Sequence, residues 1–153
     1  MSVSNLVIKI TDALKPVLVK IIPQEYLSRA KKAYMNRNTT KLKDAKIAPY
    51  KPGRYAEGIN LIGSIQAASG LGQSSRLVAA ELEASGMPYS IKEHHISEQL
   101  SMTEHEFDAK FSDELPYDIN LLHINAHEFT VSYMQLGKQV WDYRYNIAFW
   151  LWE

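Results

Sequence analysis

Two glycines in the segment 64–76 could let a ligand approach the backbone closely. Gly70 and Gly72 follow a short apolar run and stand at the beginning of a sequence with helical character. The N-terminus of a helix offers amide donors and the positive end of the helix dipole, which suits a phosphate or another anion. They form a first candidate site for a phosphate or a sugar. The same glycines would equally serve a turn or a helix cap without any ligand.

A nicotinamide dinucleotide is a weaker interpretation of these glycines. Gly70 and Gly72 approximate the beginning of the dinucleotide fingerprint, and Glu93 lies about where an acid would bind the ribose. In that fingerprint, however, the strand runs directly into the first glycine, whereas here six residues separate Gly63 from Gly70. Ser75 also stands in place of the third glycine. We therefore do not expect a dinucleotide cofactor.

A second group of polar side chains follows the nearly apolar run 117–125. His123, Asn125, His127 and Glu128 cluster at its carboxyl end. Open α/β sheets bind ligands beyond the carboxyl ends of their strands, so His123, Asn125 and His127 are candidate substrate-binding residues. Glu128 is a candidate catalytic carboxylate. The structural alternatives are a hydrogen-bonded core histidine at position 123 and a charge at a helix N-terminus at position 128.

The last apolar run, 146–153, ends with another carboxylate. Glu153 could face the same crevice and is the second candidate catalytic residue. Trp152 could accompany it there, although ordinary core positions are the alternative for both Trp150 and Trp152.

Several other site chemistries are disfavoured by the composition. The chain has no cysteine, which excludes disulfides, thiolate zinc sites and a cysteine nucleophile. Five histidines are present, but His123 and His127 span a strand end rather than one helix face, so we expect no metal site. Without a Gly-x-Ser-x-Gly motif, a hydrolase triad is not expected either.

Strand-like and helix-like segments alternate from residue 58 onward, which predicts the elements that position these side chains. The expected strands are 58–63, 89–96, 117–125 and 146–153, and the expected helices are 73–85 and 128–141, with a weakly helical segment at 101–111. Gly86 and Pro88 should end the first helix. We therefore expect an α/β fold with a Rossmann-like, mostly parallel sheet of about four strands and flanking helices.

The formal net charge of zero conceals two oppositely charged parts. Residues 1–54 hold twelve basic and three acidic side chains, whereas residues 55–153 hold five basic and fourteen acidic ones. Such asymmetry indicates a basic N-terminal arm joined to an acidic globular body. We place the arm and its linker at 1–53 and the body at 54–153.

Apolar residues of the arm recur at helical spacing and form one stripe, comprising Val3, Leu6, Val7, Ile10, Leu14, Val17, Leu18 and Ile21. Pro23 should end this helix, and a second basic helix is expected over 24–34. A basic amphipathic segment, here residues 1–37, could lie on an anionic membrane surface. Alternatively, its stripe packs on the body or on a neighbouring chain.

No apolar run approaches the about 18–20 residues of a membrane-spanning helix, and the N-terminus lacks the apolar core of a signal peptide. We therefore expect a cytoplasmic protein, peripheral on the inner face of the membrane if the arm binds lipid. The arm has few aromatic residues among its basic ones, and no nucleic-acid partner is expected.

Four sequence blocks follow one another along the body: 58–64, with Gly58-Ile-Asn-Leu-Ile-Gly63; 69–88, with Gly70-Leu-Gly-Gln73; 118–125; and 145–153. As an ordered set, they resemble the N-terminal domain of bacterial GT-B glycosyltransferases related to the retaining family 4. The resemblance implies transfer of a sugar from a nucleotide-sugar donor to a glycan or lipid-linked acceptor, as in polysaccharide biosynthesis, with no other cofactor.

The resemblance also implies roles for particular residues. Gly70, Gly72 and Gln73 would lie near the donor phosphates, although Gln73 replaces the more usual Glu. Glu153 falls where related enzymes carry a cleft residue. The C-terminal domain that holds the donor nucleotide in the family has no counterpart in this sequence, so we expect no activity from the chain alone and a requirement for a partner chain or a homo-oligomer. The alternative is a non-catalytic binding protein that pairs with a separate chain.

Overall fold

The computed structural model describes residues 25–26, 29, 46–96 and 100–150. The chain divides into two compact units, Met1–Ala45 and Lys46–Glu153. In the first, Glu25, Tyr26 and Arg29 are helical, whereas the apolar stripe expected over residues 3–21 lies outside the described residues. No helix of the described residues is long and apolar enough to cross a membrane.

The second unit begins before residue 54, because the end of the expected linker is bound to the segment preceding the last strand. The backbone N–H of Ala48 donates to Asp142 Oδ1 at 2.8 Å, and its carbonyl accepts from the Tyr143 amide at 3.1 Å. The Lys51 amide donates to the Tyr143 carbonyl at 3.1 Å. These contacts make residues 46–53 part of the α/β unit.

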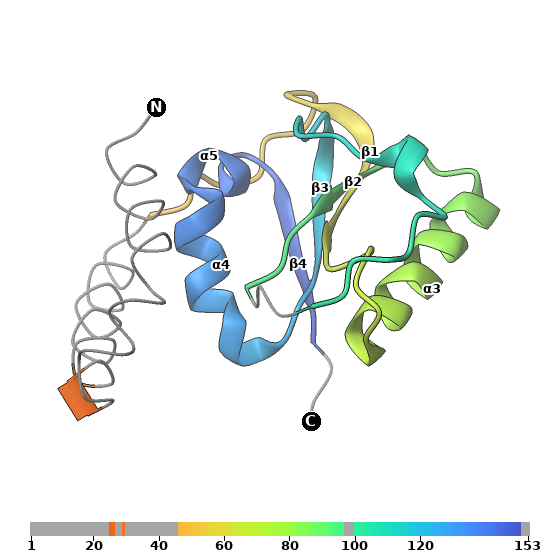
Figure 1. Ribbon diagram of the computed structural model, residues 1–153. Helices are drawn as coiled ribbons and strands as arrows, with labels where there is room; N and C mark the ends of the chain where they lie inside the picture. Colours follow the sequence, from red (N-terminus) through yellow and green to blue (C-terminus); the bar gives the residue numbers. More distant parts are fainter. Residues whose placement is uncertain (1–24, 27–28, 30–45, 97–99, 151–153) are drawn as a thin grey trace. The chain divides into compact units, whose positions relative to one another are not determined.

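Four strands form one sheet in the order β2-β1-β3-β4 (Figure 1). They are β1 (Ala56–Gly63), β2 (Tyr89–Glu93), β3 (Tyr117–His123) and β4 (Tyr145–Phe149). Each neighbouring pair is parallel, so the predicted Rossmann-like α/β fold is confirmed and the sheet is parallel throughout. The strands stop two to four residues before the predicted ends, except β1, which ends at Gly63 as predicted.

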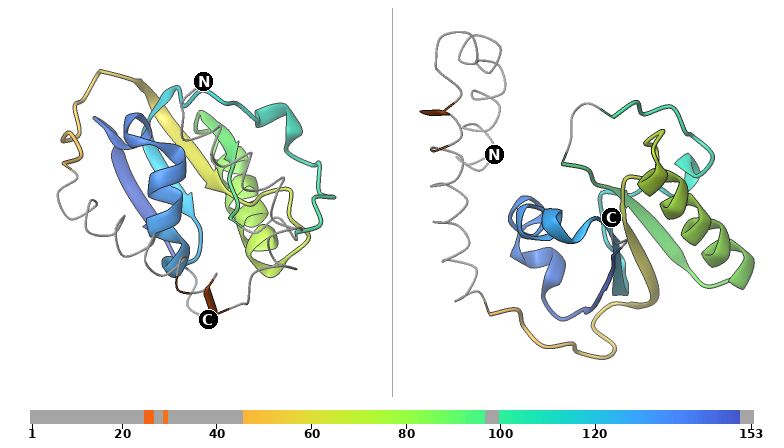
Figure 2. Two further views of the ribbon diagram at one scale, coloured as in Figure 1. Left: turned by 60° about the vertical axis from the view of Figure 1, so that its left-hand side comes forward. Right: turned by 90° about the horizontal axis from the view of Figure 1, so that it is seen from below.

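Helices cover both faces of the sheet. The helix α3 (Gly70–Ser85) lies on one face, and α4 (Phe129–Leu136) and α5 (Lys138–Trp141) lie on the other (Figures 1 and 2). The predicted end of the first helix is confirmed, because Gly86 adopts a left-handed φ of 68° and its amide bonds the Glu83 carbonyl. The helix predicted over 128–141 is interrupted at Gly137, whose φ of 81° and ψ of 155° are not helical.

The segment 101–111 is mostly not helical, contrary to the prediction. Its only regular element is the 3₁₀ turn η1 (Asp108–Lys110). The amides of Thr103 and Glu104 both donate to the Gln66 carbonyl, and Ala67 forms an isolated antiparallel bridge with Met102. These bonds to another segment replace the hydrogen bonds that a helix would need.

The core consists of two clusters, one on each face, because alternate residues of a strand point to opposite sides. Leu61 belongs to the cluster beneath α3, and its neighbour Ile62 belongs to the cluster beneath α4 and α5. Trp141 is the largest fully buried side chain. The core position considered for Trp150 is wrong, since this side chain is exposed at the end of β4. Trp152 lies outside the described residues.

Candidate functional site

A cavity of about 210 Å³ lies where the carboxyl ends of the strands meet the N-terminus of α3. Its lining comprises Ser64, Ser69, Gly70, Leu71, His95, Ile96, Leu100, Asn125 and Glu128. Ser64 follows β1 and Asn125 follows β3 in sequence. The chain leaves β1 toward one face of the sheet and β3 toward the other, so the cavity lies at the point where open α/β sheets usually bind ligands.

The structure brings together only some of the predicted site residues. Gly70, Asn125 and Glu128 line the cavity, whereas Gln73 and His127 are exposed and are not part of its lining. Glu153 lies outside the described residues. One residue of the first glycine loop and two that follow the third strand therefore line the same cavity.

The two glycines of the loop have different structural roles. A Cβ atom on Gly72 would lie 2.1 Å from the Ala67 carbonyl oxygen and 2.9 Å from that of Ser64, so the helix can approach the preceding loop only through a glycine. A Cβ atom on Gly70 would meet nothing within 4 Å. At Gly72, the backbone thus closely approaches the protein's own loop rather than a ligand. Gly70 instead faces open space in the cavity.

The N-terminus of α3 is already capped by the protein itself. Ser69 precedes the helix with extended backbone angles, and its hydroxyl accepts a hydrogen bond from the Gly72 amide at 3.1 Å. Arg76 Nη1 fixes the same loop by donating to the carbonyls of Ile65 at 2.8 Å and Ala67 at 2.9 Å. An anion in the cavity would therefore approach the helix at Gly70 rather than at Gly72.

His95 is a cavity residue that the sequence analysis did not select. Its Nδ1 lies 3.5 Å from Glu93 Oε1, and the other Glu93 oxygen accepts a hydrogen bond from the Gln66 amide at 3.1 Å. Burial raises the pKa of the Glu93 carboxyl, against the opposing effect of the Gln66 amide and of His95. His95 lies two residues after the end of β2, as Asn125 does after β3, so the strand-end argument used for Asn125 could have found it.

His123 is a core residue and not part of the cavity lining. Its side chain is fully buried and stacks on Phe149, with ring centroids 4.9 Å apart and an interplanar angle of 17°. Within the described part of the chain, neither ring nitrogen has a hydrogen-bond partner. Burial lowers the pKa of the imidazole, which favours its neutral form. The core histidine considered from the sequence is thus present without the expected hydrogen bonds.

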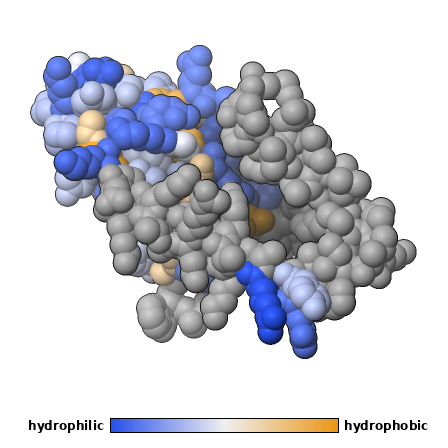
Figure 3. All heavy atoms as spheres, turned by 90° about the vertical axis from the view of Figure 1, so that its left-hand side faces the viewer, coloured by the Kyte–Doolittle hydropathy of each residue, from blue (hydrophilic) through white to orange (hydrophobic). Residues whose placement is uncertain are grey.

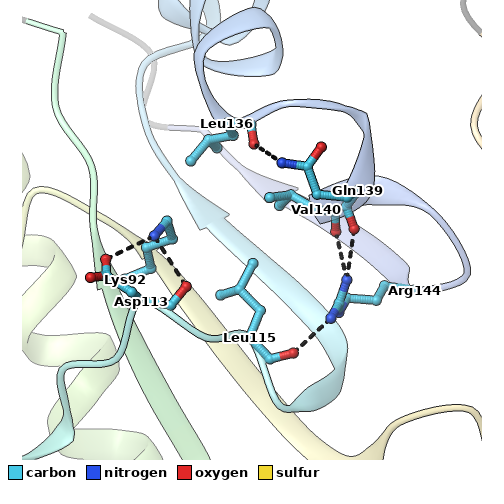
Figure 4. Close-up of a pocket in the computed structure, with 7 residues that line it drawn as sticks. All are labelled: Lys92, Asp113, Leu115, Leu136, Gln139, Val140 and Arg144. Atoms are coloured by element: carbon cyan, nitrogen blue, oxygen red, sulfur yellow. Dashed lines mark hydrogen bonds and ion pairs between the residues drawn. The ribbon is translucent and has the colours of Figure 1, made fainter. Parts of the chain in front are cut away.

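A second cavity of about 230 Å³ contains two cationic side chains that are already engaged (Figure 4). Arg144 donates to the carbonyls of Leu115, Gln139 and Val140, which Figure 4 shows, and to that of Tyr117. Lys92 Nζ lies 3.3 Å from Asp113 Oδ1. Because these donors bind protein oxygens, we assign this cavity a structural role.

Among the described residues, no group of three or more His, Asp or Glu side chains is placed to hold a metal ion. No protein-family model, curated protein or solved structure matches the chain. The fold and the cavity by themselves define a class: a parallel α/β unit with a small cavity at the carboxyl ends of its central strands.

Proposed function

We propose that the α/β unit is the acceptor-side half of a glycosyltransferase that uses a nucleotide-sugar donor and a glycan or lipid-linked acceptor. The sequence resemblance suggests this activity. The observation that supports it best is the cavity between the ends of β1 and β3, where Gly70, Asn125 and Glu128 meet.

The size and lining of the cavity suit a small polyhydroxylated group. About 210 Å³ is less than the roughly 300–1,000 Å³ of pockets for drug-sized ligands, so a sugar ring or a phosphate would fit better than a whole nucleotide sugar. Asn125 offers both a donor and an acceptor, and Ser69 offers a hydroxyl. The nucleotide would be held by the second domain that the resemblance implies.

Two side chains of the lining can exchange protons. Glu128 and His95 both border the cavity, and either could accept the proton of an acceptor hydroxyl as that oxygen bonds to the anomeric carbon of the donor sugar. The bond from this carbon to the nucleotide phosphate breaks, and the nucleotide leaves. Glu93, whose Oε1 lies 3.5 Å from His95 Nδ1, would orient this imidazole. Attachment of residues 1–37 to an anionic membrane on the cytoplasmic side belongs to the same proposal, because lipid-linked acceptors would be found there.

Ligand titrations followed by NMR test the site directly. We expect glucose, UDP-glucose or inorganic phosphate in the millimolar range to shift the amide signals of Gly70 and Asn125. The Glu128→Gln variant should bind the sugar more weakly, whereas Gln73→Ala, an exposed change outside the cavity, should leave binding intact. The absence of any shift at Gly70 and Asn125 would contradict the assignment of the site.

A transfer assay separates the enzyme from the non-catalytic alternative. The chain would be mixed with a GT-B donor domain, a nucleotide sugar and a lipid-linked acceptor. Product formation that is lost in Glu128→Gln supports the transferase. Sugar binding at the cavity without transfer under any of these conditions favours a binding protein.

A further inference from the structure

The two edges of the sheet differ in how they are protected. At the β2 edge, Ile91 forms an isolated parallel bridge with Phe111, and the Ser112 amide donates to the Ile91 carbonyl at 2.9 Å. At the other edge, β4 pairs with β3 on one side, and no described residue pairs with its outer side. An unprotected edge strand presents free backbone donors and acceptors to any strand that reaches it.

The side chains of β4 add apolar surface to this open edge. Tyr145, Ile147 and Phe149 share the face of the sheet that carries α3 and are 57%, 39% and 47% exposed. The core beneath α3 is built on β1 and β2, so within the described structure this half of the face is left without a helix. In contrast, the described residues visible on the face drawn in Figure 3 are mainly hydrophilic.

Several common protections against edge pairing are absent from β4. Its five residues, 145–149, include no charged side chain, no proline and no glycine, and none is buried. Natural edge strands commonly carry a lysine, a proline or a bulge for this purpose. Because β4 contains no lysine, no proline and no bulge, we expect its outer edge to pair with another strand.

We infer that β4 pairs antiparallel with the β4 strand of a second copy of this chain, about a two-fold axis at Ile147. In that register, Tyr145 lies opposite Phe149 of the second copy, and the symmetry repeats this aromatic pair on the other side of the axis. Ile147 lies opposite its own counterpart. The strand is thus complementary to itself and brings no like charges together, which favours a second copy over an unrelated strand.

The contact should be weak and reversible. Two five-residue strands bury much less surface than the about 1,200–2,000 Å² of stable interfaces. We therefore expect a monomer–dimer equilibrium that depends on protein concentration. The inference does not rest on the proposed glycosyl transfer, because the cavity lies at the carboxyl ends of the strands rather than along the edge of the sheet.

Sedimentation of the full chain between about 1 µM and about 1 mM tests the association. We expect dimers at the upper concentrations and at least about a tenfold weaker association for Ile147→Lys, which places two lysines opposite each other at the axis. Leu77→Lys is the matched control, because Leu77 is 61% exposed on α3 and lies outside β4. A chain that remains monomeric throughout would overturn the inference.

Cross-linking provides a second test, because a covalent bond traps the dimer even where a variant associates only weakly. Since the chain has no cysteine, Ile147→Cys carries a single thiol, and mild oxidation should join two copies through it. Leu77→Cys should cross-link much more slowly. Circular dichroism would show that each variant is folded. If Ile147→Lys still forms a dimer, or if Ile147→Cys forms a dimer without a cross-link, the interface lies elsewhere. Either result would contradict the pairing of β4.

Discussion

Asn60 Nδ2 donates a hydrogen bond to Asn120 Oδ1 at 2.9 Å, and both side chains are fully buried in the centre of the sheet. The pair belongs to a polar row that crosses all four strands. Ser90 Oγ donates to Asn60 Oδ1, and Asn120 Nδ2 donates to Asn146 Oδ1. The four residues are register partners in neighbouring strands, so a shift of any strand by one residue would leave buried amides without partners.

Replacement of Asn120 by leucine should therefore destabilise the fold strongly. The change removes the bonds to Asn60, to Asn146 and to the Val140 carbonyl, and Asn146 Oδ1 loses the donor that binds it. We expect the free energy of unfolding to fall by at least about 2 kcal/mol, as measured by urea denaturation. Gln73→Leu, an exposed change, is the control. Equal stability of the two variants would show that the row is dispensable.

The two glycines of the α3 loop should respond differently to alanine. Gly72→Ala places a methyl group against the Ala67 carbonyl and should cost about 1–3 kcal/mol of stability or more. Gly70→Ala should leave the stability unchanged, because its Cβ atom enters open space, but should weaken ligand binding in the cavity. Thermal unfolding and the sugar titration measure the two effects. A fully stable Gly72→Ala variant would be inconsistent with the tight contact.

Acid should destabilise the α/β unit through His94. Burial lowers the pKa of this histidine from 6.5 to about 4, and its Nε2 lies 2.9 Å from Ser132 Oγ. Between these values the unfolded chain binds the proton and the folded chain does not, so the stability falls as the pH decreases from 6.5 toward 4. Burial of His123 acts in the same direction.

Urea denaturation across this pH range checks the effect of His94. The wild-type protein should lose up to about 3 kcal/mol more than His94→Gln, a variant that keeps a hydrogen-bonding group but cannot titrate there. Identical pH profiles for both proteins would exclude His94 as the source of the acid sensitivity.

Arg144 should contribute more to stability than the neighbouring Lys92. Its guanidinium binds four carbonyl oxygens and lies 3.7 Å from the centre of the Tyr55 ring, whereas Lys92 pairs with a fully exposed Asp113. We expect Arg144→Met to cost about 2–4 kcal/mol, because four carbonyl oxygens each lose a charged donor, and Lys92→Met to cost less than about 1 kcal/mol. Chemical denaturation of both variants measures these costs. A larger loss of stability in Lys92→Met than in Arg144→Met would contradict the structural role of the second cavity.

The elements of the fold follow from apolar periodicity, but their internal details do not. The runs at 58–63 and 117–125 predicted the two central strands, because only a strand buried on both faces is apolar at nearly every position. Apolar periodicity does not predict the amides of Asn60 and Asn120 in the centre of these strands. Their polar row forms only when the strands pair in this register. The break at Gly137 depends on local backbone angles that the helical pattern does not contain.

For the candidate site, the strand-end rule predicted Asn125 and Glu128, and the glycine loop predicted Gly70. His95 was missed because the second strand was extended to Ile96, although it ends at Glu93. Gln73 was included because the family resemblance places this loop near the donor phosphates. Since α3 begins at Gly70, Gln73 lies within its first turn on an exposed side. Small errors at the ends of elements thus decide which side chains reach a cavity.

The hydrogen bonds of Ala48 and Lys51 to the segment 142–143 also have a mechanical consequence. They fasten the start of the α/β unit to the residues that precede β4, at the amino ends of the strands. Tension applied through the N-terminus would act first on these hydrogen bonds, and through them on β4. A force probe, fusion partner or surface anchor attached before Lys46 would therefore load the end of the sheet remote from the cavity.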